Sequence, residues 1–288
     1  MTPEKSPPPW SDWQPLPGGW SPSPTVLAET IDGGQSFRWH QVDGLWTGIW
    51  AGHVVQLRQT DNQLEWRAPV ALQSTAAALS RYLGLEQDWP ALTDSLPWRS
   101  DPHLAQCLAA FPDLRLLRQP FGETLLGFLC SATKQIVQIK QMCALLAERH
   151  GLPGDWPGQT PAGQQAGTVH RLPTWPELAA IPESDLRRCQ LGFRAKYIHA
   201  TARYIAQRPG WLDETEHAPY AVAKARLNAP VVAMRFKGGA RSTEHWSCQL
   251  GNWDVKPRIV PIYRRSGGNR TRWPRLGAGV RTILVSGR

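Results

Sequence analysis

The sequence lacks the features typical of membrane, secreted and disulfide-rich proteins. No apolar run approaches the ~20 consecutive residues that a membrane-spanning helix needs, and the N-terminal segment has neither the basic stretch nor the apolar core of a signal peptide. Five cysteines with no Cys-x-x-Cys pair are too few and too scattered for a disulfide framework or a zinc finger. These absences predict a cytosolic, globular protein that is not secreted.

Acidic residues are almost absent from the last 60 of the 288 residues. The formal net charge of +9 suggests a nucleic-acid partner, but its distribution is uneven. Residues 1–228 are close to neutral, whereas residues 229–288 hold 12 Lys and Arg against two Asp and Glu. All of the basicity therefore belongs to this final segment.

The patterning divides the chain into four parts. Residues 1–24 contain eight prolines and are expected to be an extended or disordered lead. Residues 25–115 form an N-terminal domain, in which short strands over 31–68 alternate as an antiparallel meander, with Phe37 and Trp39 on one face. Residues 116–228 form a helical domain, and residues 229–288 show no sustained period and are expected to be irregular. The predicted fold class is α+β.

One apolar stripe dominates the helical part. Apolar residues recur in alternating steps of four and three residues from Leu125 to Leu146, which predicts a continuous buried helix face. Cys130 and Cys143 lie on that stripe and are interpreted as small packing residues. Further helices are expected over about 175–190, 194–207 and 219–228.

Four motifs in order resemble those of the 8-oxoguanine DNA glycosylases. They are Gly34-Gln-Ser-Phe-Arg-Trp39 followed by Trp46-Thr-Gly48, then Phe111-Pro-Asp-Leu-Arg-Leu-Leu-Arg-Gln-Pro120, Leu129-Cys-Ser-Ala-Thr-Lys-Gln-Ile136 and Leu191-Gly-Phe-Arg-Ala-Lys-Tyr197. The resemblance covers about residues 27–228. It implies a small antiparallel β domain on a helix–hairpin–helix body. It also implies base-excision repair of duplex DNA that contains oxidised guanine, with abasic-site β-lyase activity and no metal or cofactor.

The resemblance also assigns roles to residues at matching positions. The damaged base is flipped out of the duplex into a pocket, where the carbonyl of Gly34 would accept the N7 hydrogen that only 8-oxoguanine carries. Thr133, Lys134 and Gln135 match the loop that contacts the cytosine left behind, and Thr133 stands where animal enzymes have asparagine. Phe193 matches the aromatic wedge that kinks the DNA. Arg194 would reach a base edge or phosphate. Each role has a plainer alternative from the residues alone. These alternatives are a turn glycine for Gly34, solvent-facing polar residues at a helix start for Lys134 and Gln135, a core residue for Phe193 and a solvated residue for Arg194.

The match ends where the family's chemistry is expected. The hairpin glycines that precede the catalytic lysine are absent after residue 228, and Lys237 is only a weak candidate for that lysine. No Pro-Val-Asp follows, and Asp254 is a poor substitute for the assisting aspartate. An out-of-frame reading of a GC-rich gene would explain the Arg-, Gly- and Trp-rich composition of 229–288. A natural basic tail that binds DNA phosphates is the alternative.

Several readings of the function therefore stay open. The first is a bifunctional 8-oxoguanine glycosylase/lyase, expected as a monomer in the cytoplasm of a bacterial-type cell or in the nucleus of a eukaryote. The second is a catalytically dead DNA-binding remnant, and the third is a truncated, unstable fold that exposes apolar surface. A helix–hairpin–helix glycosylase that repairs alkylated bases is disfavoured, because the strand from Gly34 to Trp39 points to oxidised guanine.

Overall fold

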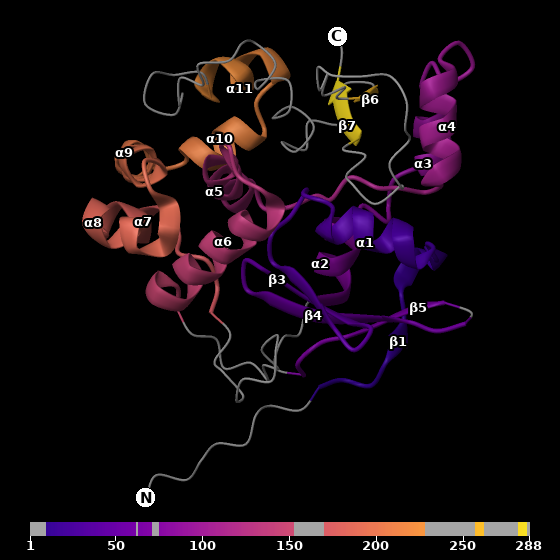
Figure 1. Cartoon of the computed structure of the whole chain (residues 1–288), viewed down its shortest axis with the longest axis horizontal. Coiled ribbons are helices and arrows are strands. Elements are labelled where there is room, and N and C mark those ends of the chain that lie inside the picture. The colour runs from indigo at the N-terminus through magenta and orange to yellow at the C-terminus, as the bar shows by residue number, and fades with distance from the viewer. Residues whose placement is uncertain are drawn as a thin grey trace, which may run out of the picture.

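The computed structural model describes residues 10–61, 63–70, 75–152 and 170–227, and the backbone of two strands at 257–261 and 282–286. A five-stranded antiparallel sheet and a body of helices lie side by side (Figure 1). The predicted α+β class and the antiparallel meander are confirmed. Among the described residues, no helix is long and apolar enough to cross a membrane.

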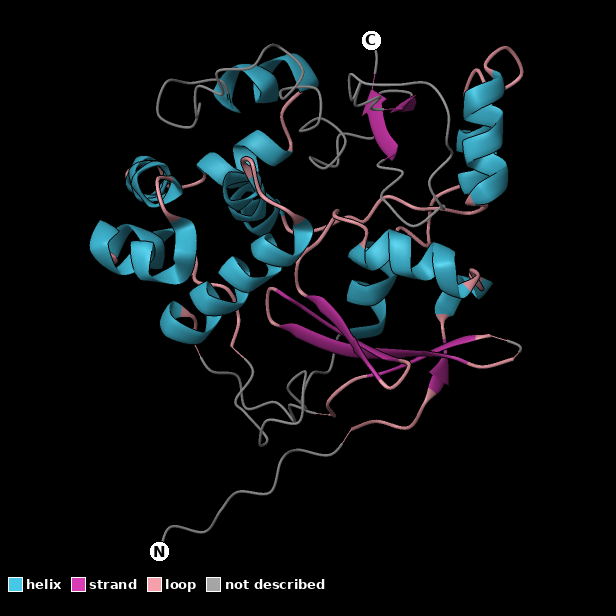
Figure 2. Cartoon of the chain, in the orientation of Figure 1, coloured by secondary structure: helices cyan, strands magenta, loops and turns pink. Residues whose placement is uncertain are grey.

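The sheet has the strand order β1-β5-β4-β3-β2. Successive pairs from β2 to β5 are joined by short turns, and the β3–β4 turn carries Ala51 with a left-handed φ of +46°. Helices α1 and α2 contact the sheet, which buries the tryptophans of the strands (Figure 2). The strands are β1 (Gln14–Pro15), β2 (Trp39–Val42), β3 (Leu45–Trp50), β4 (His53–Gln59) and β5 (Leu64–Arg67).

The structure describes residues 10–24 of the Pro-rich lead, and these residues are ordered and in part extended rather than disordered. Gln14 and Pro15 pair with β5 as an edge strand, where a proline is tolerated because that strand has only one partner. Leu16 and Trp20 are 5% and 4% exposed and belong to the apolar cluster of the sheet. Burial of these two side chains fixes the segment in spite of its proline content.

Two further expectations for the N-terminal domain are wrong in detail. Residues 24–32 form helix α1, although strands are expected from residue 31 onward. Ser23 caps this helix by accepting a hydrogen bond from the Val26 N–H at 3.2 Å. Phe37 and Trp39 do not share a face. Trp39 is 1% exposed within the sheet cluster, whereas Phe37 precedes β2 and packs against the helical cluster.

The apolar stripe from Leu125 to Leu146 belongs to two helices rather than one. Helix α5 ends at Ser131 and α6 begins at Ile136, because Ala132 is extended and Thr133 has a left-handed φ of +55°. Gln135 then starts α6 with a capping box that it forms with Gln138. The stripe continues across the break because both helices turn the same side to the core. Cys130 and Cys143 are buried there, which confirms that they pack.

The segment from 175 to 190 is also divided. An extended Ile181, which precedes Pro182, ends α7, and a wide helical turn follows α8. The helices of the described residues are η1 (Pro17–Gly19), α1 (Pro24–Asp32), α2 (Thr75–Tyr82), α3 (Trp89–Asp94), α4 (Pro102–Ala110), α5 (Phe121–Ser131), α6 (Ile136–His150), α7 (Trp175–Ala180), α8 (Glu183–Leu186), η2 (Arg187–Leu191), α9 (Arg194–Ala206), α10 (Trp211–Glu216) and α11 (Tyr220–Leu227).

The buried apolar residues form two clusters. The sheet cluster includes residues as late as Leu117, and the helical cluster begins with Phe121. The sequence places the domain boundary at 115/116, so the change of cluster falls a few residues later. Within the predicted irregular tail, β6 (Pro257–Pro261) and β7 (Thr282–Ser286) pair as antiparallel strands.

Candidate functional site

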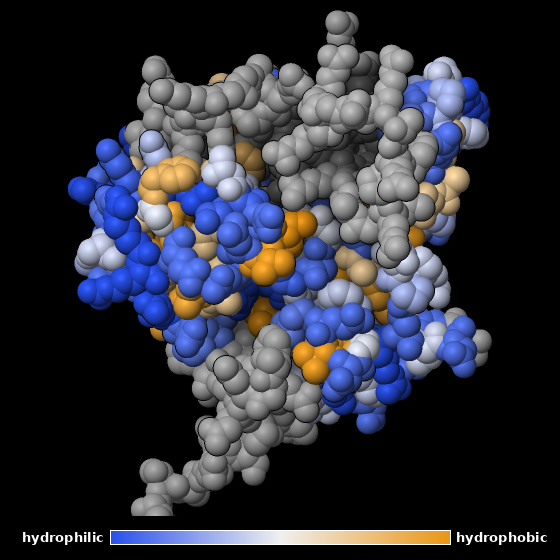
Figure 3. Space-filling view, in the orientation of Figure 1, coloured by the Kyte–Doolittle hydropathy of each residue, from blue (hydrophilic) through white to orange (hydrophobic). Residues whose placement is uncertain are grey.

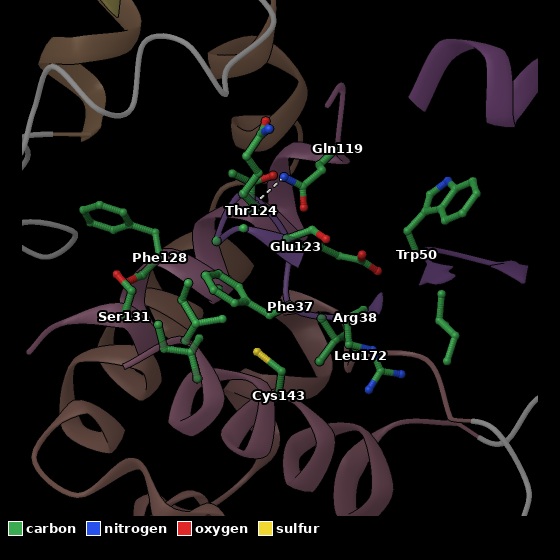
Figure 4. Close-up of a pocket in the computed structure, with 18 of the residues that line it drawn as sticks. Phe37, Arg38, Trp50, Gln119, Glu123, Thr124, Phe128, Ser131, Cys143 and Leu172 are labelled. Atoms are coloured by element: carbon green, nitrogen blue, oxygen red, sulfur yellow. Dashed lines mark hydrogen bonds between the residues drawn. The ribbon is translucent and has the colours of Figure 1, made fainter. Parts of the chain in front are cut away.

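A cavity of about 250 Å³ lies where the N-terminal domain meets helices α5 and α6. Its wall combines the Gly34–Trp39 motif, the end of β3 and the inner faces of the two helices (Figure 4). Both apolar and polar side chains line it, as is common in pockets that bind small molecules. The residues that line this cavity include Gly34, Phe37, Arg38, Trp50, Gln119, Glu123, Lys134, Ile136 and Cys143.

Gly34 occupies a position where a side chain would be strained. Its φ is +112°, and a Cβ there would lie 3.1 Å from Cδ1 of Ile136 at the start of α6. A glycine is therefore needed for its backbone angle and for the close approach of α6. Gly34 lies in a turn that forms part of the cavity wall, and the contact of its carbonyl with a damaged base stays a prediction.

Gln35 fixes the turn that contains Gly34. Its side-chain amide donates hydrogen bonds to the carbonyls of Thr30 at 3.2 Å and Arg115 at 2.8 Å, and its Oε1 accepts the Leu117 N–H at 3.1 Å. Gln119 donates in turn to the Gln35 carbonyl at 2.6 Å. These bonds tie the motif to the segment that leads into α5.

Two opposite charges lie in the cavity wall. Glu123 of α5 accepts a hydrogen bond from the Ala51 N–H at 2.7 Å, and in Figure 4 its carboxylate lies toward Trp50. Burial raises the pKa of Glu123, although the Ala51 hydrogen bond and the positive charge of Arg38 oppose the shift. Arg38 donates to the carbonyl of His170, and burial lowers its pKa. Glu123 is not among the site residues that the sequence predicts, although it is the single charged residue of α5.

The loop between α5 and α6 holds three of the predicted site residues. Thr133 and Gln135 are exposed, and Lys134 is half-buried and lines the cavity. The Gln135 backbone N–H donates to Oε1 of Gln138 at 3.3 Å, and the Gln135 side chain caps the first turn of α6. The structure thus brings Lys134 and Gly34 to one cavity, while Thr133 faces outward beside it.

Phe193 and Arg194 lie at the start of α9 in opposite environments. Phe193 is 53% exposed, so the reading of it as a core residue is wrong, and its ring meets that of Tyr197 edge to face. Arg194 is 2% exposed, so it is neither the solvated residue nor the open DNA contact that the sequence suggests. Its guanidinium donates hydrogen bonds to the backbone carbonyls of Leu191 and Ala132.

The remaining sequence candidates fall elsewhere. Lys237 and Asp254 lie outside the described residues. The described ranges contain no group of three or more His, Cys, Asp or Glu side chains suited to a metal ion. Hydrophilic residues dominate the face shown in Figure 3, with small hydrophobic patches among them.

Comparison with known proteins gives a consistent result. Residues 20–125 match the family model for the 8-oxoguanine DNA glycosylase N-terminal domain. The N-glycosylase/DNA lyase OGG1 of Arabidopsis thaliana is 27% identical over 194 residues, which cover 66% of this chain and 51% of that relative. The N-glycosylase/DNA lyase of Saccharomyces cerevisiae is 29% identical over 213 residues, or 69% of this chain and 54% of that relative. The chain therefore spans about half the length of the curated relatives it matches.

The fold is also found in solved structures. The 8-oxoguanine glycosylase/lyase of Clostridium acetobutylicum, solved in complex with double-stranded DNA containing cytosine opposite 8-oxoG, superposes with a TM-score of 0.63 at 24% identity. The match covers 77% of this chain and 71% of that one. Together the domain match and the curated relatives confirm the resemblance that the four motifs predict, and the chain is similar to the 8-oxoguanine DNA glycosylases, with residues 20–125 matching the N-terminal domain of that family.

Proposed function

We propose that this chain acts in base-excision repair by binding duplex DNA that contains 8-oxoguanine and accepting the flipped base in the cavity beside Gly34. The observation that carries the proposal is the position of Gly34. It lies on the wall of a cavity of about 250 Å³, in a turn whose backbone angle suits only glycine. A backbone carbonyl discriminates between 8-oxoguanine and guanine because guanine has a lone pair at N7, where 8-oxoguanine has a hydrogen.

The DNA-facing groups support the same proposal. The exposed Phe193 is available as a wedge between bases. Thr133 and Gln135 are exposed beside the cavity, at the place from which a loop would enter the duplex. The substrate would be met in the cytoplasm of a bacterial-type cell or in a eukaryotic nucleus.

The first experiment measures the affinity of Gly34→Ala and of the unchanged chain for duplexes that contain either 8-oxoguanine or guanine. The preference for 8-oxoguanine is the ratio of the two affinities. We expect the preference for 8-oxoguanine to fall about tenfold, because the added Cβ strains the turn and moves the carbonyl. Gly44→Ala is the matched control. Gly44 also has a left-handed φ, of +79°, but a Cβ there meets nothing within 4 Å. Equal loss of preference in both variants would contradict a role for Gly34 in the pocket.

Catalysis is tested separately by borohydride trapping on the 8-oxoguanine duplex. A glycosylase that is also a lyase forms a Schiff base between a lysine and the sugar, which borohydride converts to a stable adduct. A trapped adduct that disappears in Lys237→Arg would identify that lysine as the nucleophile. Lesion-specific binding without any adduct would favour the alternative, a DNA-binding remnant without catalysis.

A further inference from the structure

A second cavity, of about 520 Å³, is lined by helices α3 and α4 and by residues 111–116. It has about twice the volume of the cavity beside Gly34, and Leu114 is the one residue that lines both. In Figure 1, α3 and α4 lie at the opposite side of the molecule from α9. This second cavity, called the α3–α4 groove below, is therefore well separated from the Phe193 turn.

The chemistry of the α3–α4 groove differs from that of the cavity beside Gly34. Apart from Thr93, Asp94, Cys107 and Asp113, every residue that lines the groove is apolar. None of these four is buried, whereas a pocket for a heterocycle needs polar groups that converge on the ligand and fix its orientation. The groove therefore suits apolar side chains rather than a polar small molecule.

The apolar residues form a buried base with accessible side chains above it. Trp89 and Leu104 are 6% and 1% exposed, and the Trp89 Nε1 donates to the Gly84 carbonyl at 2.8 Å, which fixes the ring. Trp98 and Leu108 are only half-buried. An accessible apolar surface rimmed by polar residues is typical of a site that binds another protein.

The groove lies in an acidic segment of a chain that is basic overall. Residues 86–114 contain five Asp and Glu against one Arg, whereas the whole chain has a formal net charge of +9. The arginine, Arg99, bonds to Asp94 at 2.5 Å and lies over the Trp98 ring at 4.3 Å. Asp113 also lines the groove and is exposed. Such a surface repels DNA phosphates and attracts a basic protein segment.

The dimensions of α4 indicate what the groove would hold. Helix α4 has nine residues and is therefore ~13 Å long, at a rise of ~1.5 Å per residue. A helix that lies along it contacts it over about two turns, with apolar residues at i, i+3 or i+4, and i+7 on one face.

We propose that the α3–α4 groove is a docking site for a short amphipathic helix of a protein partner, with apolar residues on one face and Lys or Arg on the other. The apolar face fills the groove, and the basic residues meet the acidic rim. This inference goes beyond the proposed function and does not depend on it, since its test uses no DNA.

The test measures binding of three fluorescein-labelled peptides of about 14 residues to the full chain by fluorescence anisotropy. The first peptide has Leu at helical spacing and Lys elsewhere. The second has Glu in place of every Lys, and the third has the composition of the first in an order without an apolar face. We expect a micromolar dissociation constant for the first peptide, because so short a groove gives a small interface. Binding of the other two should be at least tenfold weaker.

The first pair of variants tests the apolar contact. Leu108→Gln places a polar amide in the groove and should weaken binding of the Leu/Lys peptide about tenfold, because that amide loses water without gaining a partner. Val222→Gln on α11 is the matched control. Val222 is also an accessible apolar residue, at 45% exposure, but it lies outside the groove, so the dissociation constant should change less than twofold.

The second pair tests the charge. Asp113→Asn removes one negative charge from the rim, and Asn tolerates the left-handed φ of +60° at this position. It should weaken the Leu/Lys peptide about threefold and strengthen the Leu/Glu peptide. Asp12→Asn, at an exposed position on the lead, should change neither.

Three results would overturn the inference. Equal affinity for the Leu/Lys and Leu/Glu peptides would show that charge does not select the occupant. Peptide binding that survives both Leu108→Gln and Asp113→Asn would place the peptide elsewhere on the chain. Binding of the chain to phosphatidylcholine vesicles that Leu108→Gln abolishes would make the groove a lipid contact. If Leu108→Gln does not fold, Asp113→Asn on the exposed rim still decides.

Discussion

Gln35 shows how single side chains shape the candidate site. Its amide bonds to backbone groups of Thr30, Arg115 and Leu117, the last two some eighty residues further along the chain. The motif around Gln35 is visible in the sequence, and it suffices to predict a resemblance. Its partners are not visible, because backbone acceptors carry no side-chain signature. The role of Gln35 therefore becomes clear only once the two segments are seen together.

Glu177 supports a pH prediction at the same scale. Arg171 donates to both of its carboxylate oxygens, at 2.6 and 2.8 Å, and lowers the pKa of Glu177 to about 2. A lowered folded-state pKa adds stability that is fully present above the ordinary value of about 4.5 and is lost as the pH falls toward 2. We expect Glu177→Gln to lower the unfolding free energy at pH 7 by about 1 kcal/mol. A larger effect is not expected because the pair is partly exposed and screened.

Urea denaturation between pH 3 and pH 7 checks this expectation. The difference in unfolding free energy between Glu177→Gln and the unchanged chain should become smaller as the pH falls. Glu183→Gln is the matched control, since Glu183 pairs with Arg187 on the surface of a single helical segment and should matter by only a few tenths of a kcal/mol. A gap that stays constant down to pH 3 would assign the effect to lost helix capping rather than to the carboxylate charge.

At the scale of elements, the break between α5 and α6 matters most. The 3.6-residue periodicity runs through residues 132–135 without interruption, so the sequence predicts one helix. The left-handed Thr133 and the capping box at Gln135 end one helix and start the next. Periodicity reports only which side is buried, and two helices that turn the same side to one core preserve it. The loop that carries the candidate DNA contacts is thereby hidden within an apolar stripe.

The turn before α9 gives a prediction at this scale. Phe193 is 53% exposed, so Phe193→Ala should change the unfolding free energy by less than about 0.5 kcal/mol. The same change should weaken binding to 8-oxoguanine duplex about tenfold, because base–aromatic stacking is worth ~1–3 kcal/mol. Thermal unfolding and a fluorescence-anisotropy titration measure the two effects.

Val222→Ala on α11 is the control for an exposed apolar side chain, at 45% exposure. It should leave both stability and DNA affinity unchanged. If Phe193→Ala and the unchanged chain bind the 8-oxoguanine duplex with equal affinity, Phe193 does not contact the DNA. A large loss of stability would return it to the role of a packing residue.

At the scale of the whole molecule, the two apolar clusters are held against each other around the cavity. The Glu123 carboxylate of the helical part accepts the Ala51 N–H of the β3–β4 turn, and Arg38 of the N-terminal part donates to His170. Each of these contacts joins residues more than seventy positions apart. The cavity wall therefore depends on how the two parts dock, and not on either part alone.

The lead segment supplies the prediction at this scale. Trp20 is 4% exposed in the sheet cluster, and the Arg115 guanidinium lies over its ring at 4.6 Å. We expect Trp20→Ala to lower the unfolding free energy by about 3–4 kcal/mol through the cavity it leaves. Gln14 on the same segment is exposed. Gln14→Ala should therefore change the unfolding free energy by less than about 0.5 kcal/mol. Chemical denaturation compares the two, and a stable Trp20→Ala variant would restore the reading of a disordered lead.

The sequence by itself determined the fold class, the meander, the apolar face of each helix and the family resemblance, because these depend on local periodicity and on motifs contiguous in the chain. The resemblance also predicts Gly34, Thr133, Lys134, Gln135, Phe193 and Arg194 as residues that contact the flipped base or the DNA, and the structure places Gly34 and Lys134 in one cavity wall. Only the tertiary structure decided that Arg194 points inward, that Glu123 lies in the cavity wall and that Trp20 is buried. Each of these depends on a partner far along the chain. The free energy of burial and hydrogen bonding is set by what surrounds a group in space, which no local pattern records.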